Sequence, residues 1–214
     1  MAHSKPYVAK ADLQKPLGFP GELAPGWEKV AVMKLGELVS QSRALQVFLD
    51  ACVKCGACTD KCHYFLGTGD PKNMPVARQD LLRSVYRRYY TFAGKHFPKL
   101  VGARDMTKEV LDDWYSYFHQ CSQCRRCSVF CPYGIDTAEI SMAARDIMDS
   151  VGLGQKYSNE IIGKVHKIGN NLGLPGPALR NTLDGLEEDV KESTGVAVRF
   201  PLDEKGAEVL LVTP

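Results

Sequence analysis

All eight cysteines of this chain lie in two short runs that share one spacing. The first run is CVKCGACTDKC, from Cys52 to Cys62, and the second is CSQCRRCSVFCP, from Cys121 to Pro132. In each run the cysteines follow one another at steps of three, three and four residues. Cysteines at steps of three let one looped stretch of backbone present three sulfurs to a single small group. A [4Fe–4S] cluster is held by thiolates in such runs.

The fourth cysteine of each run is expected on the first turn of the following helix. In two-cluster ferredoxins this fourth cysteine ligates the other cluster, so the two ligand sets are crossed. The sequence therefore predicts two [4Fe–4S] clusters that tie the two halves of one domain together. The first would be held by Cys52, Cys55, Cys58 and Cys131, and the second by Cys121, Cys124, Cys127 and Cys62.

Structural zinc is the alternative for these thiols, since two sites of four cysteines would also use eight thiolates. Zinc sites usually combine separated CxxC pairs, whereas neither run has that form, so iron–sulfur clusters are favoured. Disulfides are disfavoured because the N-terminus, MAHSKPYVAK, lacks the apolar segment of a secretory signal. The chain is therefore expected in the cytoplasm, where thiols stay reduced.

The residues between the cysteines raise two further points. His63 follows Cys62 where a proline follows the last cysteine of the second run. We expect this histidine to face solvent or to make a hydrogen bond, and ligation is the alternative. Arg125 and Arg126 lie inside the second run. Nearby positive charge would give that run the higher reduction potential, unless these side chains point to water and are screened.

Apolar residues at helical spacing flank both runs, which predicts a mainly α fold. One helix leads into each run and another follows it, so the order helix, run, helix occurs twice and indicates a pseudo-symmetric pair. Asp105 is expected to cap the helix that enters the second run, and Asp136 with Glu139 to form a capping box after it. The predicted stripes are Leu45, Phe48, Leu49 and Cys52; Leu81, Leu82, Val85, Tyr86 and Tyr89; Met106, Val110, Leu111, Trp114, Tyr117 and Phe118; and Ile140, Ala143, Ala144, Ile147 and Val151.

Three parts are expected along the chain. Residues 1–33 contain four prolines and are predicted to form an extended N-terminal arm. Residues 34–155 would form an α-helical, ferredoxin-type domain with two clusters. Residues 156–214 would form a helical tail, with weaker helices near 158–168 and 177–192. The tail ends in AEVLLV (207–212), a predicted strand at which a further domain would begin.

Composition and motifs exclude several functions. The net charge of +2 gives no strong field for nucleic acid, and no apolar stretch is long enough to span a bilayer. The sequence contains no GxSxG, HExxH, P-loop or dinucleotide fingerprint, so we expect no catalytic site in this chain. The basic and aromatic stretch 83–100 fits an exposed face or a docking surface for an acidic or membrane-bound partner better than it fits nucleic acid.

The two runs, with the helical stretch between them, resemble the C-subunit module of heterodisulfide reductases. The segments GTGDPKNMP, CSQCRRCSVFCPYGID and GAEVLLVTP resemble most closely the DsrK family. These proteins are heterodisulfide-reductase-like iron–sulfur subunits of a membrane-bound complex of dissimilatory sulfur metabolism. The resemblance covers essentially the whole chain.

This resemblance implies an electron-transfer module in a redox complex. It implies a position on the inner face of the cytoplasmic membrane, beside a cytochrome b-like subunit. It also implies a downstream catalytic part that reduces a disulfide or trisulfide of a small sulfur-carrier protein. The alternatives are an iron–sulfur subunit of a flavin-dependent dehydrogenase, of the glycolate or glycerol-phosphate type, and a zinc-stabilised interaction module.

Overall fold

A computed structural model of the chain describes residues 22–209, which contain helices and no strand. The predicted mainly α fold is thereby confirmed. The chain divides into two compact units, residues 1–154 and 155–214. The helices of the first unit are α2 (Trp27–Gln41), α3 (Arg43–Ala51), α4 (His63–Thr68), α5 (Pro75–Tyr90), α6 (Phe92–His96), α7 (Lys108–His119), α8 (Arg126–Val129) and α9 (Thr137–Ser150), with 3-10 turns η1 (Thr59–Lys61) and η2 (Pro71–Asn73).

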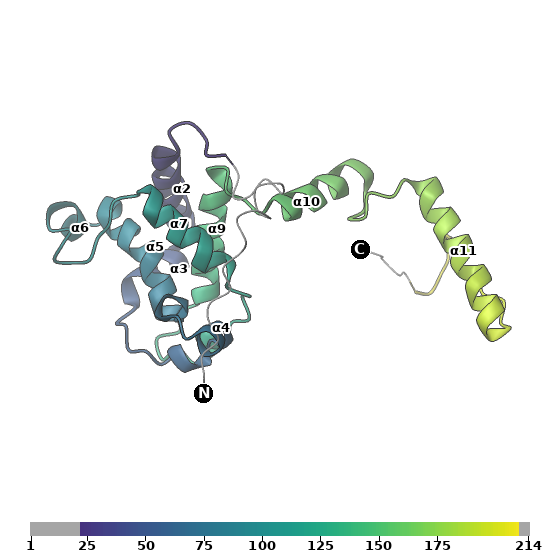
Figure 1. Ribbon diagram of the computed structural model, residues 1–214, viewed down its shortest axis with the longest axis horizontal. Coiled ribbons are helices and arrows are strands. Elements are labelled where there is room, and N and C mark those ends of the chain that lie inside the picture. Colours follow the sequence, from purple (N-terminus) through teal and green to yellow (C-terminus); the bar gives the residue numbers. More distant parts are fainter. Residues whose placement is uncertain (1–21, 210–214) are drawn as a thin grey trace. The chain divides into compact units, whose positions relative to one another are not determined.

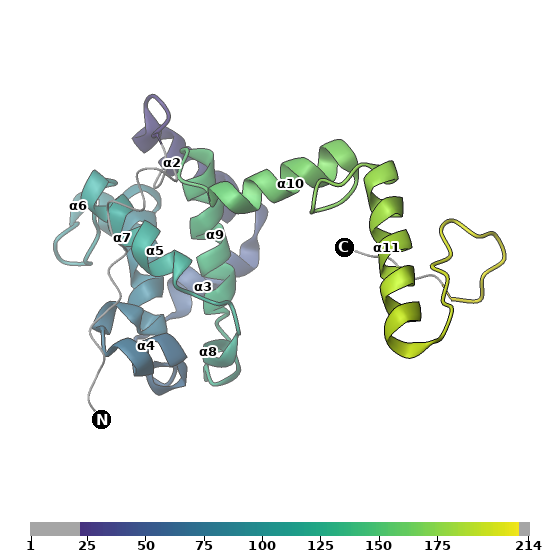
Figure 2. The same ribbon diagram turned by 45° about the vertical axis from the view of Figure 1, so that its right-hand side comes forward.

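Helix α9 is the centre of the first unit. It contacts α2, α3, α5 and α7, and the last two also contact each other (Figure 1). The short helices α4 and α8 lie together at one end of this bundle (Figure 2). Helices α3 and α7 end immediately before Cys52 and just before Cys121, so both cysteine runs start at the same end. The predicted order of helix, run and helix is present twice.

The predicted apolar stripes form the core of the bundle. Every stripe residue of α9, and most of those of α3, α5 and α7, are buried. Trp114 is 1% exposed, and its ring lies edge-on to that of Phe118 with 5.8 Å between the ring centroids. Its Nε1 donates a hydrogen bond to the carbonyl oxygen of Leu81 at 3.2 Å. Burying an indole with its N–H satisfied places α7 firmly against α5. The core thus fixes the two helices that bracket the cysteine runs.

The two predicted helix starts differ in outcome. Asp136 caps α9, since its carboxylate accepts from the backbone N–H groups of Ala138 and Glu139. The capping box is not formed, because Glu139 accepts a hydrogen bond from Ser42 Oγ at 3.2 Å instead. The cap predicted at Asp105 is wrong. Thr107 caps α7, and the carboxylate of Asp105 accepts from Arg88 Nε at 2.6 Å.

The boundaries of the predicted parts also shift. Helix α2 begins at Trp27, directly after Gly26, because no proline follows Pro25 to prevent it. The rest of the predicted arm, residues 1–21, lies outside the described residues. Of the predicted strand 207–212, residues 207–209 are irregular and the remainder lies outside the described residues.

The second unit contains the two predicted helices of the tail. They are α10 (Lys156–Ile168) and α11 (Gly176–Thr194). None of the side chains described in this unit is buried. Over residues 22–209 as a whole, no helix combines the length and apolar character needed to cross a bilayer.

A close approach at Gly152 fastens the first described residues to the end of α9. The backbone N–H of Ala24 donates to the carbonyl oxygen of Val151 at 3.0 Å. Gly152 has φ +94°, and a Cβ there would lie 2.3 Å from the carbonyl oxygen of Glu22. Gly102 has φ +64° and open space around it. The two glycines share a left-handed backbone and differ only in crowding.

We predict that Gly152→Ala lowers the free energy of unfolding more than Gly102→Ala. Left-handed backbone alone costs an alanine about 1–2 kcal/mol. Gly152→Ala adds a clash with backbone, which cannot move aside as a flexible side chain can. Urea unfolding of the two variants, followed by circular dichroism, measures the difference. Equal losses would show that the contact between Gly152 and Glu22 does not constrain the fold.

Candidate metal centre

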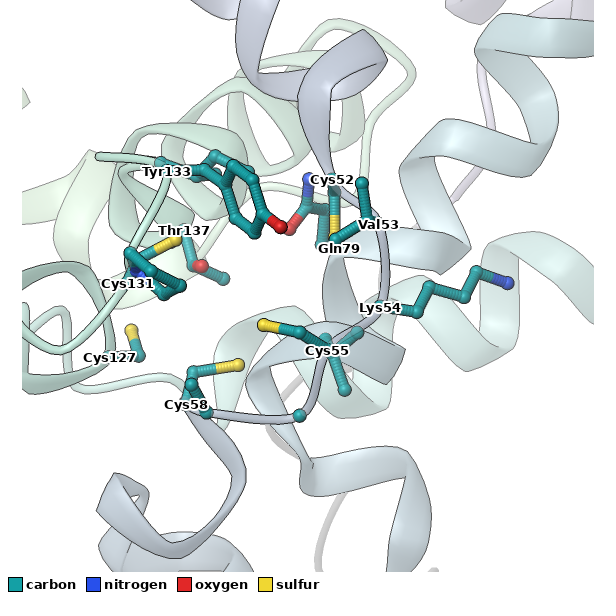
Figure 3. A pocket seen from close by; sticks show the side chains of 15 residues that line it. Cys52, Val53, Lys54, Cys55, Cys58, Gln79, Cys127, Cys131, Tyr133 and Thr137 are labelled. Carbon is teal, nitrogen blue, oxygen red and sulfur yellow. The ribbon is translucent and has the colours of Figure 1, made fainter.

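The eight cysteines stand around two adjoining hollows at the end of the first unit. The first hollow is lined by Cys52, Cys55 and Cys58 of the first run together with Cys127 and Cys131 of the second, all seen in Figure 3. The second hollow is lined by Cys62, Cys121, Cys124 and Cys127. They enclose about 350 and 330 Å³ of empty space, counting the open space at their mouths. The fourth cysteine of each run therefore lies with the first three cysteines of the other.

The cysteines are spread around these hollows. Among the described residues, no three Cys, His, Asp or Glu side chains form a group that could hold a single metal ion. Cys55 and Cys124, the second cysteine of each run, are exposed at the surface, whereas Cys62 is buried. The thiols of the second hollow thus range from buried to exposed, and those of the first from half-buried to exposed.

Cys127 borders both hollows, and its position couples the two sets of thiols. Burial raises the pKa of Cys58 to about 11, and the nearby Cys127 contributes to that rise. Burial also raises the pKa of Cys127, and hydrogen bonds with Thr137 and Ser128 offset part of that rise. These thiols hold their protons at neutral pH. A metal that binds them as thiolates must therefore displace protons.

The backbone of the two loops follows one pattern. The residues before and after the second cysteine are left-handed in both runs: Lys54 and Gly56 in the first, with φ of 56° and 80°, and Gln123 and Arg125 in the second, with φ of 56° and 58°. Only one of the four is glycine, although left-handed backbone costs other residues about 1–2 kcal/mol each. Successive backbone turns of this kind direct N–H groups into a concave nest, which binds anions and iron–sulfur centres.

The starts of α5 and α9 face the same hollows. Val76 of α5 and Thr137 of α9 line the first hollow, and Pro75 and Ala138 line the second. The backbone N–H of Val76 forms a hydrogen bond with the sulfur of Cys58. The N-terminal end of a helix carries a partial positive charge, which stabilises negative groups beside it. Both hollows are therefore prepared for an anionic group.

Two arginines hold the first cysteine of each run in place. Arg83, 2% exposed, donates from Nη1 to the carbonyl oxygen of Cys52 at 2.6 Å. Arg145 donates from Nη2 to the carbonyl oxygens of Cys121 and Phe118. Burial lowers the pKa of Arg145. These roles could not be predicted from the sequence, because an arginine on a helix is ordinarily a surface residue.

Three charged residues within the runs, Lys54, Lys61 and Arg125, form ion pairs. Lys54 donates to Asp80 at 2.8 Å, and Arg125 pairs with Asp136 at 3.1 Å. Lys61 pairs with Asp60 at 2.8 Å and also lies over the ring of Phe130 in the second run. His63 Nε2 lies 3.4 Å from the hydroxyl of Ser122. The contacts of Lys61 with Phe130 and of His63 with Ser122 join the two runs.

Comparison with known proteins agrees with this geometry. Residues 48–135 match the family described as 4Fe-4S dicluster domain. This region is a dicluster domain. It holds two [4Fe–4S] clusters, as the spacing of the cysteines predicts. The structural zinc alternative is thereby set aside.

The relatives of the chain include iron–sulfur subunits of Hdr-like menaquinol oxidoreductases. It is 48% identical over 194 residues to an Hdr-like menaquinol oxidoreductase iron-sulfur subunit 2 of Archaeoglobus fulgidus, and 45% identical over 193 residues to such a subunit of Archaeoglobus profundus. Each match covers 90% of this chain and 35% of the relative. It is 30% identical over 122 residues to one subunit of the dihydromethanophenazine:CoB--CoM heterodisulfide reductase of Methanosarcina barkeri, covering 55% of this chain and 29% of that protein.

The chain spans about a third of the length of these relatives. The comparison with solved structures found no match. The resemblance to heterodisulfide-reductase-like iron–sulfur subunits is confirmed at this level, and none of these relatives carries the name DsrK.

The residues of the dicluster domain fit the clusters that the family implies. Each hollow offers thiols on several sides, left-handed loops and a helix start, which together suit an anionic iron–sulfur group. When bound, each cluster supplies transfer of one electron at a time. The protein holds the sulfurs in place and directs the backbone N–H of Val76 toward the sulfur of Cys58.

We predict that the backbone at Gln123 decides how well the second loop forms. Gln123→Gly should retain iron and raise the free energy of unfolding by about 1 kcal/mol, because glycine adopts left-handed backbone without strain. Gln123→Val should lower the iron content of the purified protein, because a β-branched residue resists that backbone. Iron and acid-labile sulfide per chain measure the effect. Full iron content in the valine variant would contradict the role of the loop.

Proposed function

We propose that the two clusters of the dicluster domain have crossed ligands. The arrangement of the thiols around the two hollows supports this assignment. Because Cys127 borders both hollows, its own assignment rests on the order of the cysteines in the second run. The first cluster is assigned to Cys52, Cys55, Cys58 and Cys131, and the second to Cys121, Cys124, Cys127 and Cys62.

The chain itself acts as an electron-transfer module. The observation that carries this proposal is the pair of adjoining thiol-lined hollows, which share Cys127 and therefore keep the two clusters close. Electrons would pass between a membrane haem or quinone partner and a site that reduces a disulfide. The 48% identity to a subunit of an Hdr-like menaquinol oxidoreductase supports this complex over that of a flavin-dependent dehydrogenase.

The finer proposal places the chain in sulfur metabolism, as the DsrK-like subunit of a membrane-bound complex. Its partners would be a cytochrome b-like subunit and further redox subunits, on the inner face of the cytoplasmic membrane. A small sulfur-carrier protein with a disulfide or trisulfide would be the substrate of the whole complex. The resemblance of GTGDPKNMP and CSQCRRCSVFCPYGID to that family supports this proposal.

Crossed ligation predicts which cluster each cysteine variant loses. Cys62→Ser should damage the cluster held by the first three cysteines of the second run, although Cys62 belongs to the first run. Cys131→Ser is the matched control and should damage the other cluster. The wild type should contain about eight iron and eight sulfide per chain, with two spin-coupled signals in its EPR spectrum after reduction.

Each serine variant should retain the signal of the untouched cluster. The two signals are first assigned with Cys55→Ser and Cys124→Ser, since each of these cysteines lines one hollow only. If Cys62→Ser and Cys55→Ser lost the same signal, the ligands would not be crossed.

The proposed complex can be recognised by its cofactors. The protein, tagged in its native host and purified without oxygen from solubilised membranes, should bring with it a haem-containing subunit, detected by the pyridine haemochrome spectrum. A flavin in place of haem would favour the dehydrogenase alternative. Purification without haem from both membranes and the soluble fraction would contradict the proposed membrane partner.

A further inference from the structure

A buried arginine without a carboxylate lies beside the second hollow. Arg78, on α5, is 2% exposed. Its Nε donates to the backbone carbonyl of Tyr117 at 2.8 Å, and its Nη2 donates to Asn73 Oδ1 at 2.9 Å. Both partners are neutral. Within residues 22–209, no carboxylate lies at ion-pair distance from this guanidinium, although twelve other ion pairs are formed there.

A buried cation needs a compensating negative charge. Hydrogen bonds to a carbonyl and an amide satisfy N–H groups, but they do not neutralise the charge, and burying an unpaired ion is strongly unfavourable. Arg83, on the same helix, has the same exposure, and its Nε lies 3.3 Å from a carboxylate oxygen of Asp80. Arg78 therefore lacks what its neighbour on α5 has.

The missing negative charge belongs in the second hollow. Arg78 lines this hollow together with Cys62, Cys121 and Cys124. Arg145 donates to the carbonyl oxygen of Cys121 and lies near Arg78. The charge of Arg78 is among the causes that lower the pKa of Arg145. No carboxylate lies at ion-pair distance from Arg145 in the described part of the chain either. Two cations that no carboxylate neutralises thus adjoin one set of thiols.

A [4Fe–4S] cluster held by four thiolates carries net negative charge, and reduction adds one electron to it. A buried cation beside such a cluster favours the reduced form, since the attraction grows with the charge of the cluster and is little screened by water. Arg83, which donates to the backbone carbonyl of Cys52 but does not line the first hollow, shares its charge with Asp80. Among the residues that line the two hollows, the second hollow alone has a buried arginine.

We propose that Arg78 is the buried counter-charge of the second cluster and raises the reduction potential of that cluster above that of the first. The inference rests on the two-cluster site proposed above. It assigns a role to a residue that lies outside both cysteine runs. It also makes the second cluster the one that is reduced first. Arg78 would act on the cluster through its charge and would not bind iron.

The exposed arginines of the second run give a matched control. Arg126 is exposed and lies between Cys124 and Cys127 in the sequence. If proximity along the chain determined the potential, Arg126→Gln would lower it. Under our proposal Arg126→Gln leaves both midpoint potentials unchanged, because water and salt screen an exposed charge.

The test is an EPR-monitored redox titration of the purified, iron-loaded protein and its variants. Arg78→Gln removes the charge and keeps a donor for the carbonyl of Tyr117. It should shift the reduction equilibrium of the second cluster at least tenfold toward the oxidised form, which is about 59 mV for one electron. The first cluster should keep its potential. Arg78→Lys keeps the charge, so the second cluster should keep a potential close to its wild-type value.

A second variant keeps the proposal testable if Arg78→Gln folds poorly. Asn73→Asp is almost isosteric and places a carboxylate 2.9 Å from Nη2 of Arg78. It neutralises the arginine without removing it, and should lower the potential of the second cluster in the same direction. The signals are assigned with Cys55→Ser and Cys124→Ser, as above.

The outcomes separate the two proposals. Unchanged potentials in both Arg78→Gln and Asn73→Asp, with full iron and sulfide, would overturn the role of Arg78 and leave the clusters in place. An equal shift in Arg126→Gln would also overturn it. A wild-type protein without iron and sulfide would instead overturn the two-cluster site itself.

Discussion

Crowding of eight thiols at one end of a small helical bundle is the constraint on which the rest of this structure depends. Burial raises the pKa of Cys58 and Cys127, neighbouring cysteines add to each rise, and as thiolates the sulfurs repel one another. The protein offsets this negative charge with the partial positive charges of backbone N–H groups and with the full positive charges of arginines. The starts of α5 and α9 and the left-handed loops supply N–H groups, and buried arginines supply cations. Removing the negative group would leave these positive groups unopposed.

The crossing of the chain follows from the same constraint. The first run ends at α4, which starts beside the second hollow, and Cys131 at the end of the second run lines the first hollow. If the ligands are crossed as proposed, neither half can form its site alone. The core makes this possible, because α9 contacts α2, α3, α5 and α7 and fixes both loops at one end. The surface contacts between Ser122 and His63, and between Lys61 and Phe130, join the same two loops. In this pseudo-symmetric arrangement, a single hydrophobic core supports both sites.

Much of the fold could be predicted from the sequence, and the reasons for the failures are physical. The four stripes were correct because burial of apolar side chains at helical spacing depends on little else. The cap at Asp105 failed because Arg88, from a neighbouring helix, competes for the carboxylate. The capping box failed in the same way, because Ser42 reaches Glu139. Both errors come from partners distant in the sequence, which a local pattern cannot reveal.

The charges around the clusters show the same limit in a more consequential form. The sequence draws attention to Arg125 and Arg126, which lie among the cysteines, yet Arg125 pairs with Asp136 and Arg126 is exposed. Arg78 lies 43 residues before Cys121 in the chain and still borders its hollow. Its one sequence signal is its place four residues before Leu82, on the buried face of α5. The positive charge of an arginine at such a position needs a negative partner. The negative charge of the adjoining cluster increases when the cluster is reduced and decreases when it is oxidised. Under the role proposed for Arg78, the asymmetry between it and the carboxylate-paired Arg83 would let the second cluster accept an electron before the first.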